Sequence, residues 1–164
     1  MTRATPSVAL FAALALLGGC GFHLQGVSHL PPAFATTALV ASDRYTEFHR
    51  ALSDALRVSG SSLVTTATGA GATIEVLGDE NGQRVLSIWA SNTPTEYEVY
   101  YTVRYRVRVG DHEALPMQEL TLTRDYSFDT GAVLAKEHEQ DMIRSALARE
   151  LAALVMRRLT ALPP

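Results

Sequence analysis

The clearest pattern in the chain is an unbroken alternation of side chains over residues 96–109. The odd positions hold only valine or tyrosine, whereas the even positions are mostly charged or polar, as at Glu98 and Thr102. Successive side chains of an extended strand point to opposite faces, so this segment predicts a long, half-buried antiparallel strand with one wet face. A second alternation over 117–128 predicts a strand that returns beside it after a turn at 110–112.

Two other segments repeat their apolar residues every three or four positions, which is typical of amphipathic helices. The first helix is predicted over about 44–58, with Ser42 and Asp43 as candidate caps, and the second over about 136–160. The first helix would bury Tyr45, Phe48, Leu52, Ala55 and Leu56, and the second Ile143, Leu147, Leu151, Leu154, Val155 and Leu159.

Strand signal also occurs over 36–41 and 72–91, and the small, polar segment at 59–71, between the first helix and the second of these strands, is expected to be a surface loop. The dipeptide Asn81-Gly82 interrupts the second of these strands and is compatible with either a hairpin turn or a bulge in one long strand. Because the sheet and both helices are apolar on one side only, we expect an α+β two-layer sandwich. Its sheet would be about four-stranded and mostly antiparallel, with both helices on one face and the other face polar.

The N-terminus has the layout of a secretory signal, with Arg3 followed by an apolar run over 8–17 that is shorter than the roughly 20 residues of a membrane-spanning helix. The run ends in Gly18-Gly19-Cys20, which resembles a bacterial lipoprotein signal. That resemblance implies diacylglycerol on the thiol, cleavage before Cys20 and acylation of the new amine. It also implies outer-membrane sorting, because Gly21 rather than Asp follows the cysteine. The alternative is an ordinary signal peptide with an incidental cysteine.

These segments divide the chain into a signal peptide (1–19), a lipidated linker (20–35) and one α+β domain (36–162). Cys20 is the only cysteine, so disulfide bonds are not expected to stabilise the domain. The formal net charge of −3 gives no support for nucleic-acid binding. The five histidines have no metal-ligand spacing, and Ser61 and Ser62 lack the glycines of a nucleophile elbow. We therefore expect no metal, no cofactor and no enzymatic activity.

Three arginines, Arg104, Arg106 and Arg108, lie at every second position and so share the wet face of the long strand. They are spaced by about 7 Å, and guanidinium groups bind phosphate in a bidentate way, so this row is a candidate surface for an anionic ligand. The alternative is that the arginines only keep the face wet, paired with Glu96, Glu98 or Asp125.

Three motifs together resemble the LPS-assembly lipoprotein LptE family. They are Cys-Gly-Phe-His-Leu at 20–24, Thr-Glu-Tyr at 95–97, and Ala-Lys-Glu-His-Glu-Gln-Asp-Met-Ile at 135–143. The resemblance implies an outer-membrane lipoprotein that plugs the wide β-barrel of its partner LptD and helps to insert lipopolysaccharide at the cell surface. It also favours one kinked strand through Asn81-Gly82 over a hairpin.

The resemblance adds Lys136, which matches the family's Ala-Lys pair, to the candidate residues for lipopolysaccharide. Lipid A is bis-phosphorylated, so our hypothesis is weak binding through Arg104, Arg106 and Lys136. A further basic site would be expected in the turn after Trp89, but this chain has Ala90-Ser91 there. The alternatives are an accessory lipoprotein of another lipid transport system, facing the periplasm, and a lipid-anchored hydrolase, for which the sequence offers no nucleophile–base pair.

Overall fold

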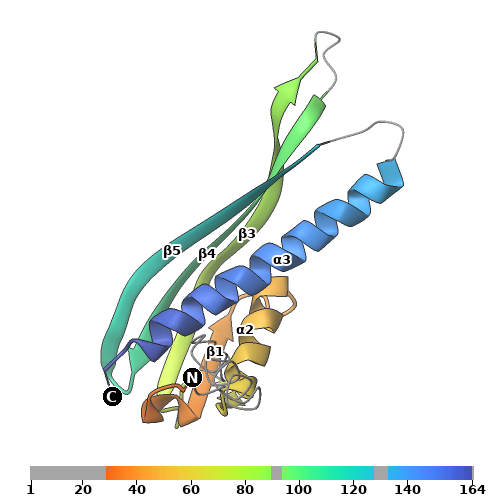
Figure 1. The fold of residues 1–164 in the computed structure, drawn as a ribbon. Coiled ribbons are helices and arrows are strands. Elements are labelled where there is room, and N and C mark those ends of the chain that lie inside the picture. The colour runs from red at the N-terminus through yellow and green to blue at the C-terminus, as the bar shows by residue number, and fades with distance from the viewer. Residues whose placement is uncertain (1–28, 90–93, 128–132, 164) are drawn as a thin grey trace, which may run out of the picture.

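The computed structural model describes residues 29–89, 94–127 and 133–163, so Cys20 and the predicted signal peptide lie outside the described residues. A five-stranded sheet forms one layer, and two helices form the other (Figure 1). The elements are a short 3-10 helix (Pro32–Ala35), β1 (Thr36–Ala41), α2 (Glu47–Val58), β2 (Ser62–Val64), β3 (Ala72–Ile88), β4 (Pro94–Val109), β5 (His112–Ser127) and α3 (Val133–Thr160).

The strand order is β2-β1-β3-β4-β5. The three long strands β3, β4 and β5 pair antiparallel, whereas β1 pairs parallel with both β2 and β3. The predicted two-layer α+β architecture is confirmed. The segment 59–71 is not only a loop, however, because it contains the edge strand β2, whose three residues are too few to show an alternating pattern.

The core lies between the sheet and the helices. Every second side chain of β4 from Val99 to Val107 is buried there, as the alternation predicted, and apolar residues of both helices pack on this row. The largest buried side chains are Phe34, Phe48, Leu52, Leu56, Ile74, Val99, Tyr101, Val103, Tyr105, Leu147, Leu151 and Leu159.

The start of the first helix differs from the prediction. The helix begins at Glu47, and the hydroxyl of Thr46 caps it by accepting a hydrogen bond from the His49 amide at 3.1 Å. Tyr45 therefore precedes the helix and is 90% exposed rather than part of the apolar face. Asp43 accepts a hydrogen bond from the Tyr45 amide at 2.8 Å, so its side chain stabilises the preceding turn and not the helix.

Strand β3 runs without a break through Asn81-Gly82, which confirms one long strand and excludes a hairpin at that dipeptide. The principal irregularity lies earlier, where Leu77 is an extra residue between Val76 and Gly78 in the pairing with β4. This bulge changes which residues face the helices, because side chains alternate along a strand. Even-numbered residues such as Ile74 face inward before Leu77, and odd-numbered residues such as Asp79 do so after it.

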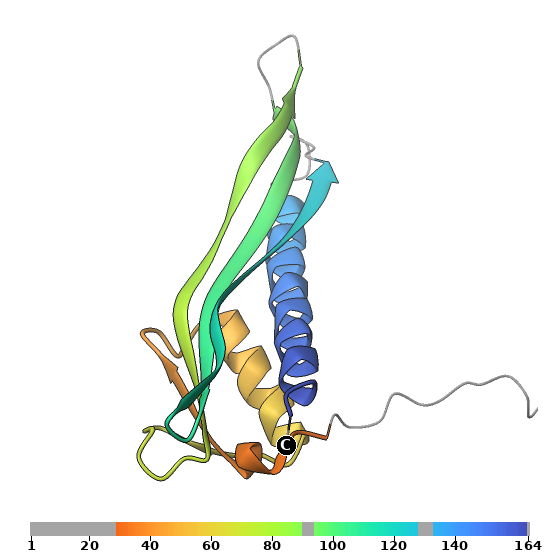
Figure 2. The ribbon, with the colours of Figure 1, turned by 90° about the vertical axis from the view of Figure 1, so that its left-hand side faces the viewer.

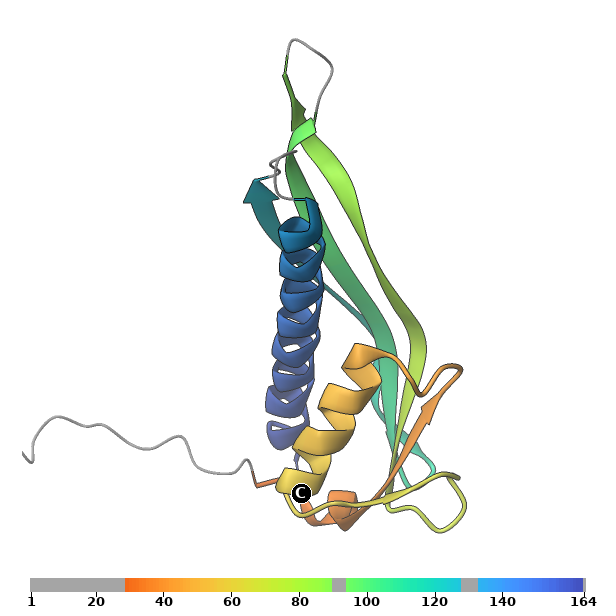
Figure 3. The same cartoon turned by 90° about the vertical axis from the view of Figure 1, so that its right-hand side faces the viewer.

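Seen edge-on, both helices lie on the same side of the sheet, and the other side has no covering element among the described residues (Figures 2 and 3). Helix α2 covers only the half of the sheet near β1, while α3 runs along most of its length (Figure 1). The paired ends of β3 and β4 extend beyond the first turn of α3. No helix in the described parts of the chain is long and apolar enough to cross a membrane.

Candidate functional site

The uncovered side of the sheet, here called the open face, is the candidate binding surface. It is formed by side chains of β3, β4 and β5 that point away from the helices, as the burial of their alternate neighbours requires. The open face consists of Glu75, Gly78, Glu80, Gly82, Arg84, Glu98, Tyr100, Thr102, Arg104, Arg106, Arg108, Glu119, Thr121, Thr123 and Asp125.

Three ion pairs cross from β3 to β4 on this face. The Arg106 guanidinium donates two hydrogen bonds to one oxygen of Glu75, at 2.8 and 2.5 Å. The Arg104 guanidinium lies 2.5 Å from Glu80, and the Arg84 guanidinium 2.5 Å from Glu98. The sequence suggested Glu96, Glu98 or Asp125 as partners for the arginine row, but the pairing of β3 with β4 brings Glu75 and Glu80 there instead.

Glycines make the surface flat beside two of these side chains. A methyl group at Gly78 would lie 2.6 Å from Nε of Arg104, so the guanidinium crosses the bare backbone at that point. A methyl group at Gly82 would similarly lie 2.6 Å from the hydroxyl oxygen of Tyr100. Between them the Thr102 and Thr121 hydroxyls are hydrogen bonded at 2.8 Å. The open face is therefore polar, and Arg84, Arg104 and Arg106 on it are each paired with a carboxylate.

Lys136 does not join Arg104 and Arg106 in one site. It lies on α3, on the opposite side of the sheet, and its ammonium is 2.7 Å from the Glu139 carboxylate. Its side chain is only 18% exposed and sits close to Tyr126, whose hydroxyl donates to Gln83 on β3 at 2.9 Å. Burial raises the pKa of Tyr126, with smaller contributions from Tyr97 and Glu139, while Lys136 lowers it. The three predicted ligand residues thus occupy two separate surfaces.

Beneath the helices, the bulge places Asp79 beside two other polar groups. The Tyr101 hydroxyl accepts a hydrogen bond from the Phe48 amide at 3.3 Å, in the first turn of α2. Burial raises the pKa of Tyr101, and the neighbouring Asp79 carboxylate raises it further. Burial, followed by the positive charge of Arg44, lowers the pKa of His49, although Asp79 opposes this shift. This cluster joins the start of α2 to β3 and β4.

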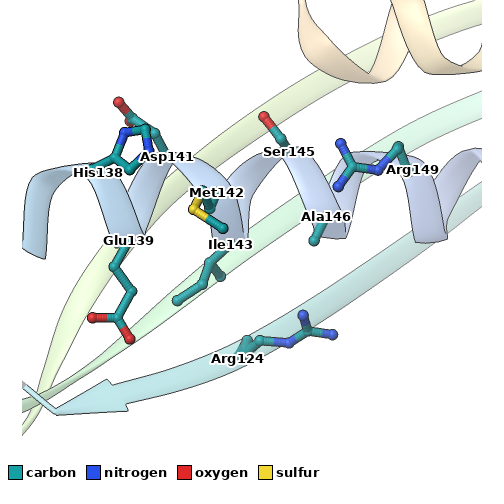
Figure 4. A pocket seen from close by; sticks show the side chains of 9 residues that line it. All are labelled: Arg124, His138, Glu139, Asp141, Met142, Ile143, Ser145, Ala146 and Arg149. Atoms are coloured by element: carbon teal, nitrogen blue, oxygen red, sulfur yellow. The ribbon is translucent and has the colours of Figure 1, made fainter. Parts of the chain in front are cut away.

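A groove of about 470 Å³ lies along the first half of α3, where Arg124 of β5 faces the helix (Figure 4). Both positively and negatively charged side chains line the groove. The Arg124 guanidinium lies 2.7 Å from the Glu150 carboxylate. The Ser145 hydroxyl donates to Glu47 of α2 at 3.1 Å and so ties the two helices together. The remaining lining residues include His138, Glu139, Asp141, Met142, Ile143, Ala146 and Arg149.

Ser61, one of the two serines considered as a nucleophile in the sequence, has a structural role. Ser61 is buried, and its hydroxyl is hydrogen bonded to the Phe34 carbonyl at 2.7 Å and to the Thr37 hydroxyl at 2.9 Å. These bonds fix the short helix at Pro32–Ala35 against the end of α2. Among the residues that the structure describes, no group of three or more histidine, aspartate, glutamate or cysteine side chains could hold a metal ion.

The architecture is that of a class of small bacterial lipoproteins. The solution structure of lipoprotein B from Nitrosomonas europaea superposes with a TM-score of 0.71 and 26% identity, covering 86% of this chain and 91% of that one. The crystal structure of rare lipoprotein B from Shewanella oneidensis gives a TM-score of 0.68 at 23% identity, covering 77% of this chain and 94% of that one.

Sequence comparison narrows this class to one family. Residues 34–159 match the family described as LptE, lipopolysaccharide-assembly. The LPS-assembly lipoprotein LptE of Pectobacterium atrosepticum is 29% identical over 154 residues, covering 93% of this chain and 83% of the relative. That of Yersinia enterocolitica is 26% identical over 148 residues, covering 90% and 71%. The chain belongs to the LptE family, as the resemblance in its motifs suggested.

Proposed function

We propose that this chain is an outer-membrane lipoprotein, anchored through acyl groups on Cys20, that fills and organises an LptD-type β-barrel and helps it to insert lipopolysaccharide at the cell surface. The role is one of binding and assembly and needs no catalysis by the chain. Membership of a lipopolysaccharide-assembly family supports the proposal, and the lipoprotein names of its relatives support an anchored form.

The observation that carries the proposal is the open face. A protein seated against the water-filled wall of a barrel needs a surface whose polar groups are already paired or can be paired by the partner. The cross-strand pairs Glu75–Arg106, Glu80–Arg104 and Arg84–Glu98 meet this need, and Gly78 and Gly82 let the Arg104 and Tyr100 side chains lie close against the sheet.

The first test is isolation of the acylated protein from its own membranes. Affinity purification of the tagged lipoprotein in mild detergent should recover a large outer-membrane β-barrel in a fixed ratio. Recovery of an inner-membrane permease instead would favour the accessory lipoprotein of another transport system. Mass spectrometry of the purified chain should also find Cys20 at its N-terminus with acyl groups attached, and an unmodified thiol would contradict the anchor.

The second part of the proposal is direct but weak contact of lipopolysaccharide phosphates with Arg104 and Arg106, and separately with Lys136. Each of these side chains already has a carboxylate partner, which limits its free charge. Removing the partners should therefore strengthen binding, whereas removing the arginines should weaken it.

This competition can be measured with neutral variants. The pair Arg104→Gln and Arg106→Gln should bind lipopolysaccharide less tightly than the unmodified lipoprotein, and Glu75→Gln with Glu80→Gln should bind it more tightly. Lys136→Gln tests the second surface, and Arg157→Gln, an exposed arginine in the last turn of α3, is the matched control. Equal affinities of all variants for lipopolysaccharide, with unchanged circular dichroism, would contradict direct phosphate contact. They would not contradict the proposed role inside the barrel.

A further inference from the structure

One edge of the sheet is formed by the short strand β2. This strand pairs with β1 through three residues and comes first in the order β2-β1-β3-β4-β5. The backbone N–H and C=O groups on its outer side therefore face no other strand in the described parts of the chain. Such an edge can accept a strand from another polypeptide, and the backbone hydrogen bonds then provide much of the affinity.

A cationic pocket of about 240 Å³ lies beside this edge, between β2 and α2. Its ionisable side chains are Arg44, His49 and Arg57, and none of the described residues that line it is acidic. His49, Ser53 and Arg57 follow one another at intervals of four residues, so they lie along one side of α2. The remaining lining residues are Leu39, Leu63, Val64 and Thr65.

The cations of this pocket have few partners. Arg44 forms no ion pair within the part of the chain that the structure describes. Arg57 lies 3.2 Å from Asp54, but both side chains are more than half exposed, so this pair is weak. The Nε2 atom of His49 is buried and has no hydrogen-bond partner. A carboxylate that enters the pocket would therefore meet two available guanidinium groups and a ring nitrogen.

The edge and the pocket together suit one kind of ligand. Side chains of an added strand would alternate between the two sides of the sheet, so every second one would point toward α2. An acidic side chain at such a position would reach the pocket while the backbone of the same segment pairs with β2. A small free anion would use the pocket alone, so the adjacent strand edge favours a peptide.

We propose that the edge of β2 and the cationic pocket bind an extended acidic segment of another protein, which adds a sixth strand to the sheet. The backbone of that segment would pair with Ser62–Val64, and its aspartate or glutamate side chains would bind Arg44 and Arg57. This inference goes beyond the proposed function, because β2 forms the opposite edge of the sheet from β5 and takes no part in the open face.

The probe is a short, fluorescently labelled peptide of alternating threonine and glutamate. Its anisotropy is recorded as the acylated lipoprotein is added in mild detergent, and we expect saturable binding. Arg44→Gln and Arg57→Gln should each weaken binding about tenfold, because charge-assisted hydrogen bonds to the carboxylates are lost. Arg50→Gln is the matched control, since Arg50 is an exposed arginine of α2 that does not line the pocket, and it should leave the affinity unchanged.

Two further peptides test the charge and the strand separately. In one, glutamine replaces glutamate, and in the other the backbone nitrogens are methylated, so that the carboxylates remain but no backbone hydrogen bond can be donated. Both should bind about tenfold more weakly than the acidic peptide. Equal binding of the methylated peptide would mean a pocket for free anions and would overturn the proposal. An acidic peptide that does not bind, or that binds Arg44→Gln and Arg57→Gln unchanged, would overturn it as well.

Discussion

At the scale of single residues, Tyr101 illustrates how one side chain joins three elements. Its ring is fully buried on β4, its hydroxyl accepts from the Phe48 amide of α2, and Asp79 of β3 lies beside it. The alternating pattern predicts that the ring is buried, but it cannot identify a hydrogen-bond partner 53 positions away.

Tyr101→Phe should destabilise the domain by about 1–2 kcal/mol, because the mutation leaves the Phe48 amide without its acceptor in a buried site. The free energy of unfolding can be measured with urea. Tyr100→Phe, on the open face of the same strand, should change it by less than about 0.5 kcal/mol. Equal losses for the two variants would contradict the structural role of the Tyr101 hydroxyl.

His49 should make stability depend on pH. Its pKa lies below the ordinary value of 6.5 because burial and Arg44 disfavour the charged ring. The unfolded chain therefore takes up a proton first as the pH falls, which favours unfolding below about pH 6.5. The free energy of unfolding should decrease from pH 7 to pH 5, and His49→Gln should make this decrease smaller. An identical pH profile for the variant would exclude His49 as a source of the decrease.

At the scale of elements, the helix layer is held by a narrow apolar stripe. Leu147 is fully buried where α3 meets α2 and the sheet, whereas Met142, just over one turn earlier, is 61% exposed. Five residues place Met142 about 140° around the helix from Leu147, so its side chain lies on another face of α3.

Leu147→Ala should therefore cost about 2–5 kcal/mol of stability, through lost burial and a residual cavity. Met142→Ala on the same helix should cost no more than about 0.5 kcal/mol. Thermal and urea unfolding of the two variants make the comparison, and a larger loss at Met142 would contradict the described packing of α3.

The bulge at Leu77 is a feature of the fold that the sequence pattern does not predict. Periodicity identified the long strands and both helices, because each has one buried face. Continued alternation from Glu75 would turn Glu80 inward, whereas the bulge turns it outward toward Arg104 and brings Asp79 beneath the helices. The arginine row was therefore predicted, but its partners were not, since the register of a neighbouring strand decides them. The short strand β2 was not predicted, because its three residues are too few to show an alternation of apolar and polar side chains.

Deleting Leu77 should leave Glu80 and Arg84 on the open face, because Val76 and Gly78 already pair with the consecutive residues Tyr105 and Arg104. The deletion should therefore cost only about 1 kcal/mol of stability, and Leu77→Ala, which keeps the bulge and shortens a half-exposed side chain, should cost a similar amount. Urea unfolding measures both variants, and a deletion that costs several kcal/mol more than Leu77→Ala would contradict the assignment of Leu77 as the extra residue.

At the scale of the whole molecule, the two sides of the sheet have different roles. The helix side holds the core, and the open face carries paired charges over flat backbone with no covering element among the described residues. The two ends differ as well, since the short helix Pro32–Ala35 lies at one end and the paired tips of β3 and β4 lie at the other. One covered side and one open side suit the proposed role of a protein seated against a barrel.

The most direct test of this account is crosslinking from the open face in living cells. A photoreactive benzoylphenylalanine replaces Tyr100, in the middle of that face, and in a matched variant it replaces Tyr45, the exposed tyrosine before α2. The account predicts a strong crosslink from position 100 to a large outer-membrane β-barrel and a weaker one from position 45. A lipoprotein that reaches the outer membrane but gives no barrel crosslink from position 100 would contradict it.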